Sequence, residues 1–239
     1  MNNRKFIVYS IIILTMVSII AGCYAIVTYK NNDKTPAKVS DGELKFKKEY
    51  EYLNNKEEDG HIHNKISVSK NNGIVYISDT DLVERMKHKS GVVFIGNNND
   101  ELSRLVIEPL LTSKENTGLK HIYYLDITGI QSELALTKKN KIKTIRKGTD
   151  SYYELLSILD YYLNPYLLYN DDKEIDTKEK RINIPLVVAF DKGNIIGIHE
   201  GSVSTHMLLN DPYTKLSESE VNELVNTYTN IMNKYLESK

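Results

Sequence analysis

The segment from Ile182 to Gly201, INIPLVVAFDKGNIIGIHEG, constrains the fold more than any other part of the chain. Pro185 opens a run of aliphatic and aromatic residues that ends at Phe190. Residues 191–194 have the composition of a tight turn, and residues 195–198 form a second apolar run. Two apolar runs joined by turn residues predict a β-hairpin. Proline cannot donate a hydrogen bond to a strand ladder, so its place at the start of the first strand fits this prediction.

The chain carries a single cysteine, Cys23, which lies inside an N-terminal apolar stretch. The remainder therefore has no thiol, which excludes an intramolecular disulfide and a cysteine-ligated metal. The formal net charge of −1 gives no electrostatic reason to expect a nucleic-acid partner. No cofactor is expected either.

Residues 1–29 are predicted to anchor the chain in a membrane. The run from Phe6 to Tyr29 contains no charge, and Arg4 and Lys5 precede it. A helix rises about 1.5 Å per residue, so a run of this length reaches across a hydrocarbon core of about 30 Å. Positive residues before such a run favour a cytoplasmic N-terminus. We therefore expect a membrane protein whose folded domain lies on the extracytoplasmic face.

A second interpretation of the same stretch is a lipid anchor. Residues 20–23, IAGC, resemble the lipobox at which bacterial lipoproteins are cleaved and lipidated on the new N-terminal cysteine. The apolar run continues beyond Cys23, which favours an uncleaved helix instead. The sequence leaves lipidation of Cys23 and a transmembrane helix as alternatives, and both place the domain on the membrane.

Residues 30–73 are rich in Lys, Glu, Asn and Asp, and we expect a polar tether there. A few apolar residues could form a short amphipathic segment within it, namely Leu44, Phe46, Tyr50, Tyr52 and Leu53. His61 and His63 are spaced like a pair of metal ligands, but solvated histidines are the expectation in a polar tether. No metal site is predicted.

From residue 74 onwards the pattern is that of one α/β domain ending at residue 239. A strand at 74–77, a helix to about 89, a strand at 92–95, a helix at 101–116 and a strand at 121–127 are expected in that order. The strand–helix–strand part predicts parallel strands with a right-handed crossover. Strand-like pieces are expected near residues 134–136 and 142–145. A helix at 150–163, an excursion at 166–181 and a capped helix at 217–236 complete the domain. The excursion carries an acidic patch, Asp171, Asp172, Glu174 and Asp176.

The ordered part of the chain resembles the thioredoxin superfamily, in particular extracytoplasmic thioredoxin-like proteins of Gram-positive bacteria, including those described as bacteriocin-transport accessory proteins. The matching pieces are VVFIG, the helix containing EPLL, IYYLDI, the helix SYYELLSILDYYL, and the hairpin segment, whose Ile184-Pro185 is similar to the cis-proline loop. The resemblance implies a thioredoxin-like three-layer fold, with a central mixed sheet flanked by helices.

Members of that family carry Cys-x-x-Cys in the loop after the VVFIG strand, and this chain does not. Counting from Gly96 places the two positions on Asp100 and Ser103, whereas counting back from Pro109 places them on Glu101 and Arg104. Neither register contains sulfur, so thiol–disulfide exchange as the family performs it is excluded. Asp100 is expected to cap a helix, and no catalytic residue is predicted.

The resemblance leaves two functions open. The first is a non-catalytic module, or a transport-accessory protein, that binds a peptide or protein in the groove of the fold. One wall would come from residues 96–103, the degenerate active-site loop, with Asn97, Asn98, Asn99, Asp100 and Ser103. The other would come from residues 183–186, the cis-proline loop, with Ile184 and Pro185. The alternative is an enzyme of the thiol–disulfide oxidoreductase family that acts through a non-thiol site or with a cysteine-bearing partner.

Overall fold

The computed structural model describes residues 39–170, 173–203 and 212–239. The predicted anchor at residues 1–29 and the lipidation candidate Cys23 lie outside these ranges. No helix in the described ranges combines the length and hydropathy needed to cross a bilayer. Residues 40–239 form one compact unit, and it is described here by itself.

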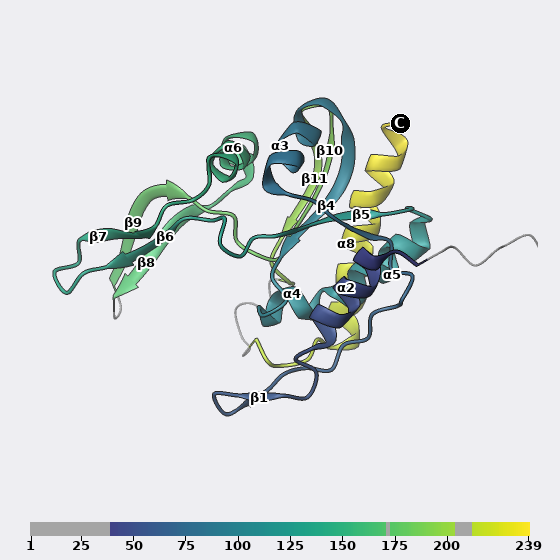
Figure 1. Cartoon of the computed structure of the whole chain (residues 1–239), viewed down its shortest axis with the longest axis horizontal. Coiled ribbons are helices and arrows are strands. Elements are labelled where there is room, and N and C mark those ends of the chain that lie inside the picture. The colour runs from purple at the N-terminus through teal and green to yellow at the C-terminus, as the bar shows by residue number, and fades with distance from the viewer. Residues whose placement is uncertain (1–38, 171–172, 204–211) are drawn as a thin grey trace, which may run out of the picture. The chain divides into compact units, whose positions relative to one another are not determined.

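A five-stranded mixed sheet forms the centre of this unit, with the strand order β11-β10-β4-β5-β3 (Figure 1). Its strands are β3 (Ile74–Tyr76), β4 (Ser90–Gly96), β5 (Ile122–Asp126), β10 (Leu186–Asp191) and β11 (Asn194–Glu200). Strands β3, β5 and β4 are parallel, as the strand–helix–strand pattern predicted. Strand β10 is antiparallel to both β4 and β11.

The predicted hairpin is confirmed as β10–β11. Asp191 pairs with Asn194, so the turn consists of Lys192 and Gly193. Both turn residues have positive φ, 44° and 89°, which is the backbone of the type I′ turns that join twisted strands. The Ile184–Pro185 peptide bond that precedes β10 is cis, as predicted.

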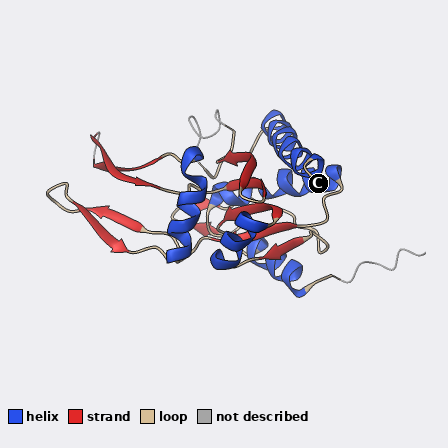
Figure 2. Ribbon diagram, turned by 90° about the horizontal axis from the view of Figure 1, so that it is seen from above, coloured by secondary structure: helices blue, strands red, loops and turns tan. Residues whose placement is uncertain are grey.

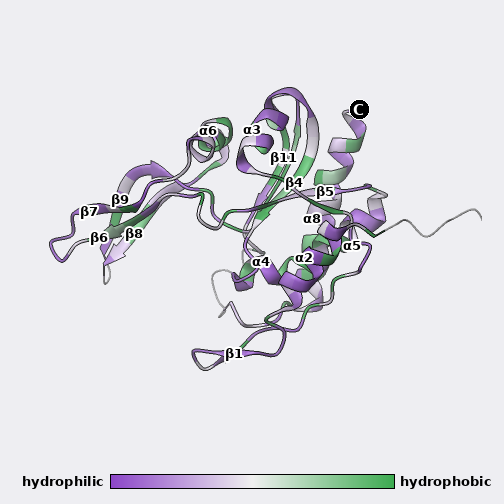
Figure 3. Cartoon of the chain, viewed as in Figure 1, coloured by the Kyte–Doolittle hydropathy of each residue, from purple (hydrophilic) through white to green (hydrophobic). Residues whose placement is uncertain are grey.

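Helices cover both faces of the sheet. Helices α3 (Asp79–His88) and α6 (Asp150–Leu159) pack on one face, and α2 (Asp41–Glu51), α5 (Ile107–Thr117) and α8 (Glu218–Glu237) pack on the other. Strand β4 shows why: Val92 and Phe94 belong to one buried cluster, while Val93 and Ile95 belong to the opposite one. Successive strand residues face opposite sides, so a continuous apolar run is what a strand buried on both faces requires. Figure 3 shows the hydrophobic residues of the sheet in green.

Residues 40–73 differ from the expected polar tether, because they pack into the domain. Ser40 begins α2 with a capping box closed by Glu43. Phe46 and Tyr50 are fully buried on this helix and make edge-to-face contacts with Tyr124 of the sheet, at ring-centroid distances of 5.1 and 5.7 Å. Most charged residues of α2 are exposed or half-buried, and only Glu43 among them is buried, so they mask the short apolar stripe in the composition of the segment. A minor hairpin, β1 (Glu57–Glu58) with β2 (His61–Ile62), follows the helix.

Two further hairpins extend from the body of the fold, one on either side of α6 in the sequence. They are β6 (Glu133–Leu136) with β7 (Ile142–Arg146), and β8 (Pro165–Asn170) with β9 (Lys173–Lys180). Figures 1 and 2 show both projecting beyond the central sheet, and we call them together the arm. The strand-like pieces expected near residues 134–136 and 142–145 are confirmed. The excursion expected at 166–181 is instead an ordered hairpin.

The helical boundaries follow from local capping. The helix expected at 101–116 is divided at Val106 into α4 (Glu101–Leu105) and α5. The helix expected at 150–163 ends as α6 at Leu159 and continues as a 3-10 turn over Asp160–Tyr162. Ser217 and Glu220 form the predicted capping box of α8.

Thr149 caps α6 and ties it to α3. Its hydroxyl oxygen accepts a hydrogen bond from the Tyr152 amide at 3.0 Å, and the hydroxyl donates to Asp79 Oδ2 at 2.6 Å. We expect Thr149→Ala to lower the free energy of unfolding by about 1–2 kcal/mol, because both bonds are lost. Urea denaturation measures this change. Ser157→Ala, at an exposed position of the same helix, is the control and should change stability by less than about 0.5 kcal/mol. An equal effect of both substitutions would contradict the assigned cap.

Candidate functional site

A groove of about 410 Å³ lies where the loop after β4 meets the loop before β10. Ile95 at the end of β4 pairs with Leu186 at the start of β10, so the antiparallel register brings the two loops to the same edge of the sheet. The lining residues are Asn97, Asn99, Asp100, Gln131, Arg181, Ile182, Asn183 and Ile184. The predicted site therefore comes together from segments about eighty residues apart in sequence.

The loop after β4 is shaped by its own polar side chains. The Asn97 side chain accepts a hydrogen bond from the Asn99 amide at 2.8 Å, and the Asn97 carbonyl accepts one from the Asp100 amide at 3.1 Å. Asp100 is the N-cap of α4, and its carboxylate accepts a hydrogen bond from the Ser103 amide at 2.7 Å. Such bonds are the reason that Asn and Asp favour turns and helix starts.

Asp100 and Ser103 occupy the two positions of the first predicted register. Asp100 is partly exposed and lines the groove, whereas Ser103 is fully buried behind it. The Ser103 hydroxyl accepts a hydrogen bond from the Asn97 amide at 3.4 Å. Ser103 therefore shapes the loop from inside and does not reach the groove. Asn98 is not among the lining residues either, and its side chain donates to the Glu49 carbonyl of α2 at 3.5 Å.

Burial raises the pKa of the Asp100 carboxyl, and the hydrogen bonds from Ser103 oppose this shift only in part. A carboxyl whose folded-state pKa lies above its unfolded value contributes stability below the unfolded pKa. That contribution is lost as the pH rises through the folded pKa.

Asp100→Asn is therefore expected to be at least as stable as the wild type at pH 7, because asparagine caps equally well and carries no buried charge. Below about pH 3.9 the advantage should disappear, since Asp100 is then protonated in both states. Urea denaturation of both proteins between pH 3 and pH 8 measures the difference. The quantity compared is the free energy of unfolding of Asp100→Asn minus that of the wild type. A smaller difference at pH 7 than at pH 3 would contradict the raised pKa of Asp100.

The loop before β10 presents free backbone groups. Pro185 is buried, and its carbonyl accepts a hydrogen bond from the Gly201 amide at 2.7 Å. No described residue makes a hydrogen bond to the N–H or C=O of Ile184, whose side chain is half-buried on the groove wall. A backbone donor and an acceptor are thus available at the rim of the groove.

Three lining residues were not among those predicted: Gln131, Arg181 and Ile182. The Arg181 guanidinium donates from Nε to Gln131 Oε1 at 3.3 Å and lies 4.8 Å from the centre of the Tyr166 ring. Arg181 and Ile182 directly precede the predicted wall at residues 183–186, and this position was the signal that could have identified them. Gln131 precedes β6 in a stretch whose pattern indicated no clear element.

Beneath the groove, α4 is held by a buried polar network that the sequence did not predict. The Arg104 guanidinium is completely buried and donates to Glu101 Oε2 at 3.2 Å and to the Asn64 carbonyl at 2.8 Å. His63 Nδ1 lies 2.8 Å from the same Glu101 oxygen, and His63 Nε2 lies 3.1 Å from Glu58 Oε2. Glu101 and Arg104, the second predicted register, therefore face this network and not the groove.

The expectation that His61 and His63 are solvated is wrong for His63, which is only 3% exposed. Its ring is buried because residues 50–64 fold back over α4 and Glu101 supplies a hydrogen-bond partner there. His61 is exposed and stacks on Tyr213 with the ring centroids 4.6 Å apart. No group of three histidine, cysteine or acidic residues in the described ranges is arranged to hold a metal ion.

The groove offers hydrogen bonding in several directions. Carboxamides, one carboxyl, one guanidinium and the Ile184 backbone supply both donors and acceptors, and Ile182 and Ile184 add apolar surface. No lining residue is a histidine, lysine, serine, threonine or cysteine, so among them no nucleophile is paired with a nitrogen base. This chemistry suits recognition of a polar chain better than covalent catalysis.

No family model matches the chain, and the search of curated proteins finds no match.

Proposed function

We propose that the chain is a membrane-anchored, extracytoplasmic protein of the thioredoxin fold. It would hold an extended peptide segment in the groove between residues 97–100 and 181–184, without redox chemistry. The observation that carries the proposal is the backbone of Ile184 at the groove rim, whose N–H and C=O have no partner in the part of the chain that the structure describes. An extended peptide laid beside Ile184 would satisfy both backbone groups, as a strand added to a sheet does.

The strand order supports the thioredoxin-like part of the proposal. In sequence order the five sheet strands lie as first, third, second, fourth and fifth, with the first three parallel and the last two forming an antiparallel hairpin. The thioredoxin resemblance implies a central mixed sheet flanked by helices, and this mixed sheet agrees with that expectation. The groove lies where the family carries its reactive loop, which here ends in Asp100.

The chemistry of the lining residues supports a peptide as the ligand. Asn97, Asn99 and Asn183 each carry a carboxamide, which can donate to a peptide carbonyl and accept from a peptide N–H. These carboxamides would bond to the repeating backbone N–H and C=O groups of the peptide and not to one particular side chain. The partner in the proposal is therefore a peptide or an unfolded segment of a protein. The chain itself would be attached to the membrane through residues 6–29, as a transmembrane helix or through lipidated Cys23.

Binding of an unfolded polypeptide tests the proposal. The probe is fluorescein-labelled, reduced and carboxymethylated α-lactalbumin, and its anisotropy is titrated with the full chain in a non-ionic detergent. We expect Asn99→Ala/Asn183→Ala to weaken binding about tenfold, since each lost hydrogen bond costs about 0.5–1.5 kcal/mol. Both side chains are exposed, so the fold should tolerate their loss.

The matched control is Asn116→Ala/Asn222→Ala, two exposed asparagines that do not line the groove. This variant should bind like the wild type. Affinity weaker than about 1 mM for the wild type, or an equal loss in the control, would contradict peptide binding in the groove.

A further inference from the structure

We propose that the arm is a second binding surface, which takes an acidic peptide segment in extended conformation between its two hairpins. The arm and the groove are separate surfaces, so this inference goes beyond the proposed function and stands or fails independently of it. It rests on three observations: an open slot between the hairpins, a strand edge at the slot that no described residue pairs with, and a cluster of lysines that forms no ion pair within the described ranges.

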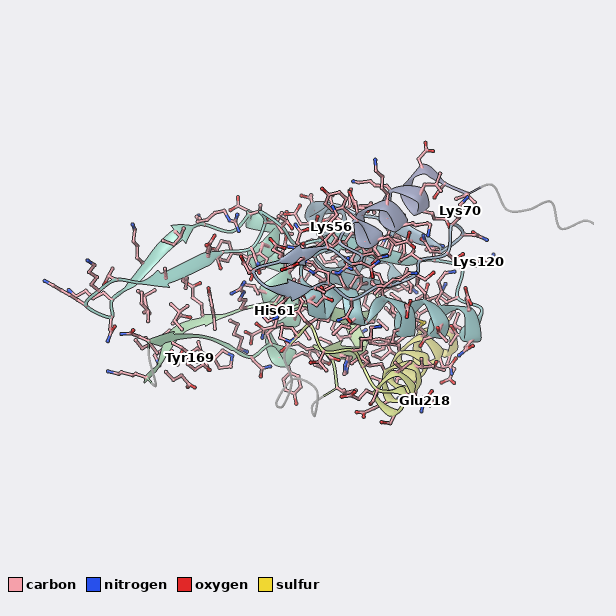
Figure 4. The ribbon with its side chains drawn as sticks, turned by 90° about the horizontal axis from the view of Figure 1, so that it is seen from below. Lys56, His61, Lys70, Lys120, Tyr169 and Glu218 are labelled. Atoms are coloured by element: carbon pink, nitrogen blue, oxygen red, sulfur yellow. The ribbon has the colours of Figure 1, made fainter. Side chains whose placement is uncertain are left out.

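The slot is a hollow of about 610 Å³ lined by residues 135–138 and 168–170. It is closed at the base, where the Tyr166 hydroxyl bonds to both the N–H and the C=O of Leu134 at 3.4 Å. It is also closed near the tips, where Asn170 Nδ2 donates to Asn140 Oδ1 at 2.6 Å. Figure 4 shows the two hairpins side by side, with Tyr169 labelled on the second. Between the two closures, β6 and β8 belong to separate sheets.

The edge of β6 that faces the slot has backbone groups without a partner. In an antiparallel pair, residues alternate between facing the partner strand and facing the outer edge. Leu134 faces outward, since its N–H and C=O bond to Tyr166. Leu136, two residues further along, has the same orientation, and no described residue outside the hairpin bonds to its backbone. Such an edge is a template for one more strand.

The charge on the first hairpin selects the partner. Residues 138–147 contain six basic side chains and no acidic one. Lys138, Lys139, Lys141 and Lys143 are exposed, and no carboxylate of the described residues lies within ion-pair distance of them. Arg146 faces Glu133 at 3.8 Å. A partner that neutralises this surface must carry several negative charges.

The slot itself favours a polypeptide over other anions. Leu136 and Leu168 are half-buried in the slot, and Tyr169 is 66% exposed at its edge. A strand rises about 3.3 Å per residue, so the four residues 135–138 match a segment of four to five residues. Polymers without a peptide backbone cannot pair with the Leu136 edge. The ligand class is therefore an acidic peptide with alternating apolar side chains.

The test uses two labelled eight-residue peptides, one of alternating Glu and Val and one of alternating Lys and Val. Binding to the full chain in non-ionic detergent is followed by fluorescence anisotropy. We expect the acidic peptide to bind at least tenfold more tightly than the basic one. Lys138→Gln/Lys139→Gln/Lys141→Gln/Lys143→Gln should weaken its binding at least tenfold, and Tyr169→Ala should weaken it about threefold or more.

The matched control removes the same charge from the body of the fold through Lys48→Gln/Lys65→Gln/Lys70→Gln/Lys120→Gln. Figure 4 shows Lys70 and Lys120 far from the hairpins. This variant should retain at least half of the wild-type affinity. An equal loss in the control, an unchanged affinity of Tyr169→Ala, or displacement of the peptide by an equal charge of polyphosphate would each overturn the proposal. Concentration-dependent dimerisation that the hairpin lysine variant abolishes would assign the slot to a second copy of the chain and overturn it as well.

Discussion

Arg104→Ala is expected to lower the free energy of unfolding by about 3–5 kcal/mol, which is typical of removing one partner from a buried ion pair. Arg104 is fully buried and donates hydrogen bonds to four groups: Glu101, the Asn64 carbonyl, the Tyr50 carbonyl and Asn54 Oδ1. Its removal leaves the Glu101 carboxylate buried beside His63 without a permanent cation. It also releases residues 50–64 from α4, the helix that forms one wall of the groove.

The measurement is urea denaturation of the wild type and the variant, read from the shift of the midpoint at constant slope. Arg146→Ala is the control, because this arginine is exposed on the arm and its ion pair with Glu133 is 3.8 Å long. It should change stability by less than about 0.5 kcal/mol. Arg104→Met/Glu101→Gln should recover part of the loss, since neither buried charge then remains. A loss below about 1 kcal/mol for Arg104→Ala would contradict the buried network.

The double variant Asp100→Cys/Ser103→Cys should gain thiol–disulfide exchange activity, which the thiol-free groove of the wild type cannot have. We expect a rate of insulin reduction at least tenfold above that of dithiothreitol alone. The Asp100 carboxylate lies 2.7 Å from the Ser103 amide, so the two side chains are adjacent across one helical turn. Asp100 is partly exposed and Ser103 is buried, which places an attacking thiol at the groove and a resolving thiol behind it.

Reduction of insulin by dithiothreitol, followed by turbidity, measures the gain. Both variants are made in a Cys23→Ala chain, so that the anchor contributes no thiol. Asp100→Cys alone is the control and should stay at background, because no second thiol resolves the mixed disulfide. The oxidised double variant should also weigh less than its reduced form by two hydrogen atoms, because disulfide formation removes one from each thiol. A folded double variant with no disulfide and no activity would contradict the thioredoxin-like placement of this loop.

The sequence predicted the elements whose burial is continuous or whose turn chemistry is explicit. Strand β4, the β10–β11 hairpin and the α8 capping box all belong to this class. Their apolar runs are long enough to fix two buried faces, and their turn and cap residues specify the backbone locally. The same logic placed Asn97, Asn99, Asp100 and Ile184 at a common site, because adjacent strands bring their loops together.

Other parts could not be predicted from local pattern. The composition of residues 40–73 is polar, and tertiary contacts such as those of Phe46 and Tyr50 with Tyr124 make the segment part of the core. His63 looked solvated because its partner Glu101 lies 38 residues away. The β8–β9 hairpin is rich in charge, and its inward residues find their partners only after folding. Thr177 donates a hydrogen bond to the Tyr166 carbonyl, and the Tyr166 hydroxyl bonds to Leu134 of β6.

Hydrogen exchange at the Ile184 amide is the measurement that reports on peptide binding in the groove at the predicted contact itself. This amide has no partner among the described residues. The full chain in non-ionic detergent is compared with and without reduced and carboxymethylated α-lactalbumin. If the polypeptide pairs with the Ile184 backbone, we expect the Ile184 amide to exchange at least tenfold more slowly when the polypeptide is bound. The Val75 amide, on the opposite edge strand of the sheet, should not change. Unchanged exchange at Ile184 under saturating polypeptide would contradict peptide binding in this groove.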